Sequence, residues 1–463
     1  MPNHATLSAR HEPDGVFAPA HLGELTTTVP PEMIDAILDQ TATTQHRVRR
    51  LPSRLVVYLI LAGALYAGQA WTAVWNRLTA GLPHPIRHPA KSSISQAMRR
   101  LGPAPLEALF RLLAGPGACL PTQQIRCAGR LVAAIDGTQI AIPDTPANGD
   151  LYPRQKAGRA SHVGYPMIRM LALVAVGTRH LIDAVWGPDT ISEKAYTTRL
   201  AAAMGPGMLV LGDRGFATIG LYTAITTAGA DFLIRGLTGP RALTLPVLER
   251  LGDGSWISRA GTVRVRVIDA EIEVTPTDRA GRPIPGEATI HRYRLITSLL
   301  DPAQAGAGEL IRLYHRRWQI ETVYCELKST ILGGRVLRGR YPAAVAQEVW
   351  GLLAAYQVLR IAMSDAILDR PEVSADRLSF TIAVRTAQDQ IVLACRAISG
   401  ARVDLVGRIG AAVLDDLLPR RGPRTRPRAL KRGTSKYHAA GGVDLRTRPA
   451  RLRATVLTPA TDP

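Results

Sequence analysis

The stretch LVAAIDGT, residues 131–138, is a short apolar run that ends in an aspartate and a glycine. The stretch MLVLGDRGF, residues 208–216, has the same form, again with an aspartate after the apolar run. Other short apolar runs lie between these two, and stretches with a helical pattern at 192–204 and 217–229 alternate with the later ones. This order predicts a mixed α/β sheet with flanking helices.

The two aspartates, Asp136 and Asp213, stand at the ends of predicted strands. An aspartate at such a position is typical of a turn, which explains either residue taken alone. Ligands of open α/β sheets, however, bind at the carboxyl ends of the strands, and both aspartates follow strands predicted to lie in the core. Carboxylates there become favourable when they share a divalent cation, so the pair indicates a metal site.

A third carboxylate comes from the predicted helix IRLYHRRWQIETVYCELKS, residues 311–329. On an ideal α-helix each residue turns by about 100°, and four polar side chains then share a stripe about 60° wide: Tyr314, Arg317, Glu321 and Lys328. Glu326 falls on another face, so the spacing selects Glu321 as the site carboxylate. An ion pair between Arg317 and Glu321 fits the same spacing, but it does not account for the tyrosine and the lysine.

Three carboxylates surrounded by cations suit the chemistry of a phosphodiester. Two Mg²⁺ ions held by Asp and Glu, for which Mn²⁺ is expected to substitute, activate a water or a 3′-hydroxyl and stabilise the leaving oxygen. Nearby Arg and Lys side chains hold the cut strand by its phosphates. The sequence contains neither a GxxxxGK[ST] loop nor a GxSxG elbow, so it indicates no rival mechanism.

The composition predicts DNA as the partner. Of the 463 residues, 57 are Lys or Arg and 37 are Asp or Glu, which gives a net charge of +20. Such an excess needs a polyanionic partner, and nucleic acid is the first candidate. The 46% share of hydrophobic residues excludes an intrinsically disordered chain. We expect a basic, multidomain protein that binds DNA and no small-molecule substrate.

Three features favour the cytoplasm over a membrane or an oxidising compartment. The uncharged stretch Leu55–Trp75 is long enough to span a bilayer, but its Gly, Gln and Thr residues favour a buried helix. The four cysteines form no CxxC pair, which argues against a zinc finger or a disulfide scaffold. Residues 1–15 are polar and lack the apolar stretch of a signal peptide.

Two basic segments are candidates for DNA contacts. The predicted helical segment 92–113 carries Arg99 and Arg100, and it is either a recognition helix or a solvated face. After Leu418 the chain is rich in Pro and Arg, and tails of this kind bind nucleic acid by charge alone. The tail residues expected to do so are Arg424, Arg426, Lys431 and Arg432.

The changes of pattern along the chain predict six segments. They are a flexible lead-in, a helical DNA-binding domain, the first part of a catalytic domain, a β-rich insertion, the last part of the catalytic domain with the polar stripe, and a C-terminal helical region with a basic tail. Their boundaries are placed at 1–30, 31–125, 126–236, 237–295, 296–370 and 371–463, respectively.

The sequence resembles DDE transposases of the insertion-element-four family. Four residues match the spacing of the YREK signature of that family: Tyr314, Arg317, Glu321 and Lys328. The strings IDGT and GDRGF around the two aspartates and RRWQIE around the glutamate agree with it. The segments 21–38 and 47–61 resemble the N-terminal domain of the family, and 427–437 resembles its basic ending, so the resemblance covers most of the chain.

The resemblance implies a ribonuclease-H-like sheet with a β-rich insertion before the last catalytic helix. The three carboxylates would bind the two metal ions, and Tyr314, Arg317 and Lys328 would contact the element end near the cut. A bacterial protein of this kind would act on the nucleoid. Two copies would pair the terminal inverted repeats, nick each end, often through a hairpin, and join the ends to target DNA.

Some residues have both a structural and a functional interpretation. Trp256, in the predicted insertion, is either a core residue or the aromatic that stacks on a flipped base. His162 and His315 are better explained as structural histidines than as site residues. The run VRVRV places Arg264 and Arg266 on one face of a strand, where a solvated face is a simpler interpretation than a DNA contact.

Two other functions remain open. A structure-specific endonuclease with the same fold would stop at hydrolysis, and it would join no 3′-hydroxyl end to a second DNA. A noncatalytic DNA-binding protein would use the carboxylates only in turns and helices. In that case Asp136→Asn, Asp213→Asn and Glu321→Gln would leave every phenotype unchanged.

Overall fold

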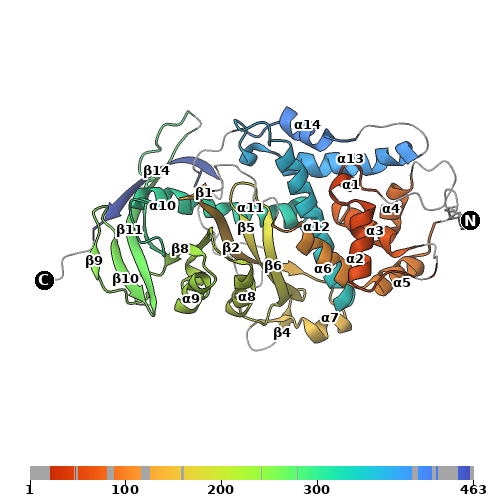
Figure 1. Cartoon of the computed structure of the whole chain (residues 1–463), viewed down its shortest axis with the longest axis horizontal. Helices are drawn as coiled ribbons and strands as arrows, with labels where there is room; N and C mark the ends of the chain where they lie inside the picture. Colours follow the sequence, from red (N-terminus) through yellow and green to blue (C-terminus); the bar gives the residue numbers. More distant parts are fainter. Residues whose placement is uncertain are drawn as a thin grey trace, which may run out of the picture.

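The computed structural model describes residues 21–45, 47, 51–80, 88–115, 126–157, 161–240, 242–278, 280–398, 405–419, 424–425 and 447–458. These residues form a mixed α/β structure in which one large sheet runs through the molecule and helices cover it (Figure 1). A bundle of N-terminal helices lies at one end of the molecule, and a β-rich unit lies at the other.

Five strands form the centre of the sheet: β2 (Arg130–Ala141), β5 (Met167–Ala175), β6 (Leu181–Pro188), β7 (Met208–Gly212) and β8 (Asp231–Gly236). Their order is β6-β5-β2-β7-β8. β5 is antiparallel to β2 and β6, whereas β7 is parallel to β2 and β8. An antiparallel meander that continues into two parallel strands beside its first strand is the ribonuclease-H-like arrangement, as the family resemblance implied.

The alternation of side chains along β2 divides the core between the two faces of the sheet. Ala133 and Ile135 belong to the core under α8 (Glu193–Leu200) and α9 (Ile219–Thr227). Ala134 belongs to the larger core on the opposite face, where α12 (Pro342–Asp365) lies. The next even-numbered residue, Asp136, is therefore directed to the α12 side of the sheet.

The sheet continues beyond β8 into the β-rich unit. β12 (Thr289–Thr297) pairs with β8, β11 (Val263–Pro276) pairs with β12, and β10 (Trp256–Ala260) and β9 (Glu249–Arg250) follow. These strands lie in or at the edge of the segment 237–295, which the sequence predicted to be β-rich. They extend the central sheet and do not form a separate one.

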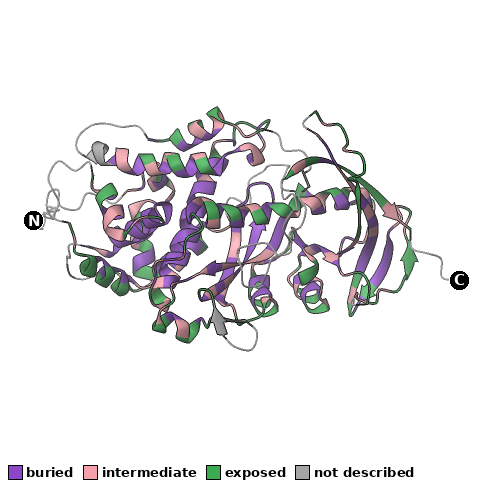
Figure 2. Cartoon of the chain, turned by 180° about the vertical axis from the view of Figure 1, so that it is seen from behind, coloured by how far each residue is buried: buried purple, intermediate pink, exposed green. Residues whose placement is uncertain are grey.

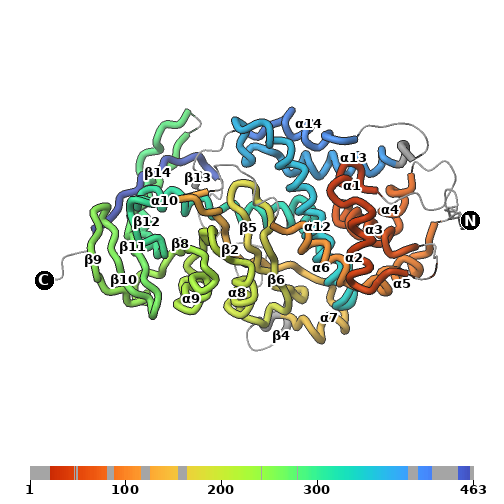
Figure 3. The backbone as a smooth tube through the Cα atoms, viewed as in Figure 1, coloured from red at the N-terminus to blue at the C-terminus, as the bar shows by residue number. Residues whose placement is uncertain are grey.

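The far C-terminal segment adds a strand that the sequence analysis did not predict. β14 (Arg448–Leu457) pairs antiparallel with β11, from Asp269 opposite Leu457 to Pro276 opposite Ala450. Figure 3 shows this segment, at the end of the colour range, beside strands from the middle of the chain. The chain beyond Leu418 is therefore more than a basic tail.

The N-terminal helices surround α12, which links them to the sheet. They are α2 (Pro31–Gln40), α3 (Ser53–Leu65), α4 (Trp71–Leu78), α5 (Lys91–Leu101) and α6 (Ala104–Leu113). Helices α3, α5 and α6 contact α12 directly. Gly351 allows α3 and α12 to approach closely, because a Cβ on it would meet the Ile60 side chain at 2.6 Å. α13 (Phe380–Ile398) and α14 (Arg408–Asp415) complete this layer.

The uncharged stretch Leu55–Trp75 forms most of α3, a turn and the start of α4. Nearly every residue of α3 is buried, which confirms the interpretation as a buried helix (Figure 2). Within the ranges that the structure describes, no helix combines the length and the apolar character that a membrane span needs.

The prediction of a flexible lead-in over 1–30 is wrong for residues 21–30. This segment contains the short helix α1 (Leu25–Thr28), and Leu22, Leu25 and Val29 are buried in the main core. Leu25 and Val29, four residues apart, lie on one side of the single turn of α1, and this pattern is too short to stand out in the sequence. Residues 1–20 lie outside the described part.

Two side chains of the β-rich unit belong to its interior. Arg266 has 0% of its surface exposed, so the prediction of a solvated face is wrong there. Its guanidinium is satisfied by Asp253, the Ser255 hydroxyl and the Ala305 carbonyl, which offsets the cost of burial. Trp256 is buried as well, in agreement with its interpretation as a core residue.

His180, after the turn between β5 and β6, gives the fold a predictable response to acid. It is fully buried, and its ring nitrogens have no hydrogen-bond partner among the described residues. Burial lowers the pKa of its imidazole from 6.5 to about 3. Between these values the unfolded chain binds a proton that the folded chain does not, so the free energy of unfolding falls as the pH decreases from 6.5.

We expect this residue to account for a loss of about 2 kcal/mol between pH 6.5 and pH 5. His180→Phe, which replaces the ring by an apolar one, should remove that part of the loss. Urea unfolding of both proteins at pH 7 and pH 5 measures it. Equal losses in the two proteins would mean that His180 is protonated in the folded state.

Candidate active site

Asp136 lies in the middle of β2 and is tied to the helix α11 (Trp318–Cys325). Its Oδ1 accepts a hydrogen bond from the Gly137 N–H at 2.8 Å. Its carbonyl oxygen accepts one from the Tyr324 hydroxyl at 2.6 Å, and this bond joins the strand to α11. The helix and the strand are thus held together at the aspartate itself.

Asp213 follows β7 directly, and β7 is the parallel neighbour of β2. Ala134 is paired with Leu211 in this ladder, so the two aspartates lie at corresponding positions on neighbouring strands. Asp213 follows the end of β7, but β2 continues to Ala141, so the prediction that Asp136 ends its strand is wrong. The Asp213 side chain accepts the Gly215 N–H at 2.7 Å and caps the short turn that follows. This bond fixes its orientation at the edge of the sheet.

The segment with the polar stripe is not one ideal helix. α10 (Ala307–Tyr314) continues into a 3₁₀ turn at His315–Arg317, then into α11, and finally into a π-helical turn at Glu326–Ile331. The wider π turn changes the angular position of Lys328 relative to Glu321, which a uniform 100° step did not anticipate. π turns within helices are frequent at functional sites.

Arg317 joins the first and the third carboxylate of the site. Its Nη1 lies 3.2 Å from Asp136 Oδ2, and its Nη2 lies 2.9 Å from Glu321 Oε1. The Glu321 side chain is 61% exposed, whereas the other two side chains are mostly buried. The structure therefore brings Asp136, Asp213 and Glu321 together around Arg317, with Glu321 facing solvent.

The charge of Asp136 is disfavoured mainly by burial and to a smaller extent by the other two carboxylates. Burial, with the charges of Asp213 and Glu321, raises the pKa of Asp136 to about 6. The bond from Gly137 and the nearby guanidinium of Arg317 act in the opposite direction and do not cancel the effect. A carboxylate in this situation is stabilised by an added cation.

The donor set fits a hard divalent cation. Asp136, Asp213 and Glu321 offer only carboxylate oxygens, which Mg²⁺ and Mn²⁺ prefer. In the described part of the chain, no three His, Cys, Asp or Glu side chains are close enough to surround one ion. The Arg317 guanidinium bonds two of the three carboxylates in this structure, and a cation would compete with it for those oxygens.

The two remaining residues of the polar stripe lie on either side of this cluster. Tyr314 is buried, which raises the pKa of its hydroxyl to about 12, and its ring meets the Tyr293 ring edge-on at 6.2 Å. Lys328 Nζ lies 3.3 Å from Thr138 Oγ1, two residues after Asp136 on β2. Lys328 thus reaches the same strand as the first carboxylate.

Sequence reasoning missed two groups that border the site. The Arg235 guanidinium of β8 stacks 3.7 Å from the centre of the Tyr293 ring, beside Tyr314. Beside Gly137, where an added Cβ would lie 3.0 Å from Glu193 Oε1, Arg169 pairs with Glu193 at 3.1 Å and with Asp189 at 2.5 Å. None of these residues belongs to a motif, and only the pairing of distant strands shows that they border the site.

Arg99 and Arg100 lie on the outward face of α5, far along the chain from the carboxylates. The exposed residues of this helix include no acidic side chain: Lys91, Ser92, Ser93, Ser95, Gln96, Arg99 and Arg100. The Arg99 guanidinium also lies 5.0 Å from the centre of the Tyr341 ring. The helix therefore presents a polar, positively charged face to solvent.

The residues predicted in the basic tail are mostly beyond what the structure describes. Arg424 belongs to the short strand β13 (Arg424–Thr425), which pairs with β14. Arg426, Lys431 and Arg432 lie outside the described residues.

The two histidines considered from the sequence have different outcomes. The His162 side chain also falls outside the described part. His315 is partly buried against Tyr293, and burial lowers the pKa of its imidazole.

Comparison with known proteins gives two family matches. Residues 19–111 match the family described as insertion element 4 transposase N-terminal, and residues 128–358 match the family described as transposase DDE domain. The chain is 28% identical over 427 residues to the transposase InsG for insertion sequence element IS4 of Escherichia coli strain K12. That match covers 89% of this chain and 92% of the relative.

Two further matches are more limited. The putative transposase InsZ of the same organism is 28% identical over 205 residues, which cover 44% of this chain and 67% of the relative. Among solved structures, the piggyBac transposase synaptic complex with hairpin DNA aligns over 89% of this chain and 87% of its own. Its TM-score is 0.43 and its sequence identity 11%, a distant likeness.

Proposed function

This chain belongs to the insertion-element-four family of DDE transposases, and we propose that it cuts DNA at the ends of its own insertion element and joins those ends to target DNA. The observation that carries this proposal is that three carboxylates lie around the guanidinium of Arg317. Arg317 bonds both Asp136 and Glu321, and Asp213 ends the strand next to Asp136.

The residues of the cluster have distinct roles in the proposed reaction. Asp136, Asp213 and Glu321 would hold two divalent cations, which when bound supply an activated water or 3′-hydroxyl and stabilise the leaving oxygen. Once a cation competes for its carboxylates, Arg317 is in place to bind a phosphate beside the cut. Lys328 would hold the same strand from the β2 side.

The Tyr314 hydroxyl keeps its proton at neutral pH, because its pKa is raised to about 12. It would therefore donate a hydrogen bond to DNA and would not act as a base. We also propose that two copies act together, each bringing one element end, because an insertion element has two ends to cut and join.

We also propose that DNA bound on the outward face of α5 continues toward the carboxylates. A cavity of about 530 Å³ lies between α4, α5 and the segment 338–348, and Lys91, Arg99 and Tyr341 are among its lining residues. Just before this segment, the Leu337 N–H donates a hydrogen bond to the Ala141 carbonyl at the end of β2. DNA on α5 would thus lead toward the strand that carries Asp136.

Excision from a plasmid that carries the native element with its flanking DNA tests the proposed function. Wild-type protein is compared with Asp213→Asn, and repaired donor junctions are amplified and sequenced. Junctions that require Asp213 support a transposase, and joined products in a second plasmid separate it from an endonuclease. Absence of junctions with a folded wild-type protein that binds the element ends would argue against cut-and-paste transposition.

The charge on α5 makes a second, quantitative prediction. If Arg99 and Arg100 contact phosphates, the double replacement by Gln should weaken DNA binding and reduce the slope of log K against log salt by about 1.8. Fluorescence anisotropy at salt concentrations from roughly 50 to 300 mM measures the slope. The matched control is Arg282→Gln, which removes an exposed arginine paired with Asp278. Equal slopes for all three proteins would show that α5 is only a solvated face.

A further inference from the structure

We propose that Arg179, in the turn between β5 and β6, is a positioning residue that sets the distance between the Glu321 helix and the Asp136 strand. The inference rests on the proposed function, because it concerns how the two halves of that site are held together. Arg179 touches neither carboxylate. It acts through the residues on either side of Glu321.

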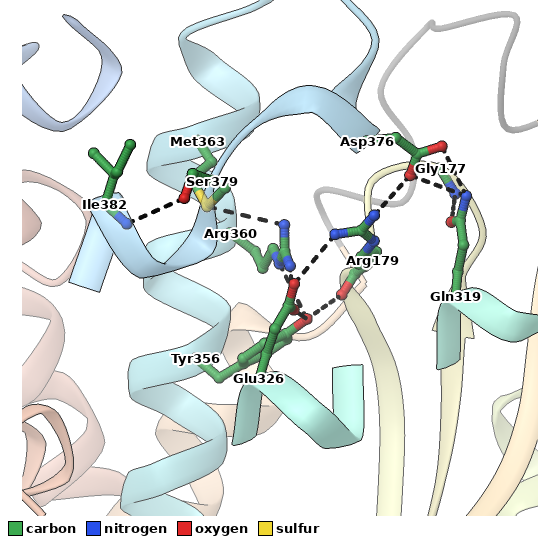
Figure 4. A network of polar contacts seen from close by, with 10 residues as sticks. All are labelled: Gly177, Arg179, Gln319, Glu326, Tyr356, Arg360, Met363, Asp376, Ser379 and Ile382. Atoms are coloured by element: carbon green, nitrogen blue, oxygen red, sulfur yellow. Dashed lines mark hydrogen bonds and ion pairs between the residues drawn. The ribbon is translucent and has the colours of Figure 1, made fainter. Parts of the chain in front are cut away.

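The turn at residues 176–179 contacts the helical segment that carries Glu321 at two points, one before and one after Glu321. Two residues before Glu321, the Gln319 Oε1 accepts the Gly177 N–H at 2.6 Å. Five residues after it, the Glu326 Oε1 accepts a bond from Arg179 Nη1 at 3.1 Å (Figure 4). The helical segment that carries Glu321 is therefore bonded to one short turn both before and after the carboxylate.

The same turn belongs to the strand that pairs with β2. β5 runs antiparallel to β2, with Ala172 opposite Asp136 and Ala175 opposite Ala133, and the turn follows at once. The turn is thus fixed to the Asp136 strand by the sheet ladder and to the Glu321 helix by side chains. A shift of the turn would change the separation of the two carboxylates.

Arg179 itself is held in a conformation that needs strong support. Its φ is +61°, a left-handed conformation that a residue with a Cβ adopts only at an energetic cost, and its side chain is 3% exposed. Such residues persist when the surroundings fix them, and they cluster at functional sites. The Tyr356 hydroxyl of α12 lies 3.1 Å from the Arg179 carbonyl oxygen.

The guanidinium of Arg179 reaches both ends of α11. One nitrogen bonds Glu326, and the other bonds Asp376 at 2.8 Å. Asp376 in turn accepts the Gln319 amide at 3.1 Å, and Figure 4 shows this closed set of contacts. The guanidinium also lies 5.9 Å from the centre of the Trp318 ring, at the first residue of α11.

The carboxylates that bond Arg179 would each keep another partner after the loss of its guanidinium. Glu326 keeps its ion pair with Arg360, and Asp376 keeps Gln319. Arg179→Gly therefore removes the link while a glycine relieves the backbone conformation at φ +61°. This substitution separates positioning from folding better than the removal of Glu326 would.

The experiment compares wild type, Arg179→Gly, Arg179→Lys and the control Arg130→Gln, all as full chains with an element-end duplex. Arg130 pairs with Asp231 on the same sheet, so the control removes a comparable arginine away from α11. Four quantities are measured: the unfolding midpoint, the affinity for the duplex without metal, the single-turnover cleavage rate, and Mn²⁺ binding followed by electron paramagnetic resonance.

For Arg179→Gly we expect the unfolding midpoint and the duplex affinity of the control. The cleavage rate should fall about 100-fold, because a misplacement of about 1 Å costs that much. The Mn²⁺ concentration for half-saturation should rise about tenfold or more, as for other residues that orient metal ligands. Arg179→Lys keeps the positive charge but cannot bond Glu326 and Asp376 with two nitrogens at once. Its cleavage rate and its Mn²⁺ binding should therefore lie between those of wild type and Arg179→Gly.

The outcomes separate this inference from the proposed function. Normal cleavage and Mn²⁺ binding in Arg179→Gly, with an active wild type, would overturn the positioning role alone. A wild type that neither binds Mn²⁺ nor cuts the duplex would overturn the proposed function and the inference with it. Unfolding of both Arg179 variants would show that Arg179 serves stability, which also overturns the positioning role.

Discussion

Replacing Glu321 by Gln is expected to lower the rate of cleavage at element ends at least about a thousandfold, without a loss of folding or DNA binding. A carboxylate that holds a catalytic cation contributes several kcal/mol to the transition state, and each 1.4 kcal/mol or so is a factor of ten in rate. Glutamine keeps the shape of the side chain and removes its charge. Because this side chain is largely exposed, the core loses nothing.

The stability of Glu321→Gln should change by less than about 1 kcal/mol, since Glu321 is largely exposed and Arg317 keeps its ion pair with Asp136. The matched control is Glu107→Gln on α6, which breaks an i,i+4 pair with Arg111 of the same 2.9 Å length. Single-turnover cleavage of an end-labelled duplex, with unfolding curves for both variants, measures the difference.

Equal rates for the two variants would remove Glu321 from the reaction and leave its pair with Arg317 as a surface contact. A loss of cleavage in both would point to general damage. Only a selective loss in Glu321→Gln, with DNA binding intact, agrees with the proposed chemistry.

Local sequence patterns were sufficient for the parts of the fold that depend on neighbouring residues. The apolar runs before Asp136 and Asp213 predicted two core strands, and the structure places these strands side by side. The apolar stretch of α3 predicted a buried helix for the same reason. Each of these predictions needed only the spacing of apolar residues and the residue that ends the run.

Contacts between distant residues were not accessible in this way. β14 mixes three arginines with small and apolar residues, and it becomes a strand because it pairs with the edge of β11. Arg266 looked like a solvated residue of a period-two strand, and it is buried because Asp253 and Ala305 meet it there. In both cases the deciding partner lies in another part of the chain.

In the candidate site, too, contacts within one helix could be predicted from the sequence, and contacts between distant segments could not. The spacing of Tyr314, Arg317 and Glu321 was visible in the sequence, because a helix places such residues together. The bond from Arg317 to Asp136 was not, since it joins a helix to a strand early in the chain. Nor did the spacing of Glu326 reveal its two arginine partners, Arg179 and Arg360, although it did separate Glu326 from Glu321.

The second large effect that we expect is a loss of stability in Glu326→Ala, because this residue has two buried arginine partners. Glu326 is buried between Arg179 and Arg360 and lies 3.0 Å from the Tyr356 hydroxyl. Removing the carboxylate leaves the buried Arg360 without a carboxylate partner among the residues that the structure describes. Breaking a buried ion pair in this way costs about 3–5 kcal/mol, so the free energy of unfolding should fall by that amount.

Urea unfolding of Glu326→Ala and of the control Glu271→Ala measures this effect. Glu271 pairs with Arg292 on an exposed face of the sheet, where the loss should stay within about 1 kcal/mol. Similar losses for the two variants would mean that the buried network adds no more stability than a surface pair does.

A double variant, Glu326→Met with Arg360→Met, distinguishes the removal of charge from the creation of an unpaired charge. It should recover most of the lost stability, because apolar side chains of similar volume replace a buried ion pair at little or no cost. Arg179 keeps Asp376 as its partner in this variant, so no arginine is left buried alone. A double variant as unstable as Glu326→Ala would instead show that the hydrogen bonds of Glu326, and not its charge, hold this part of the core.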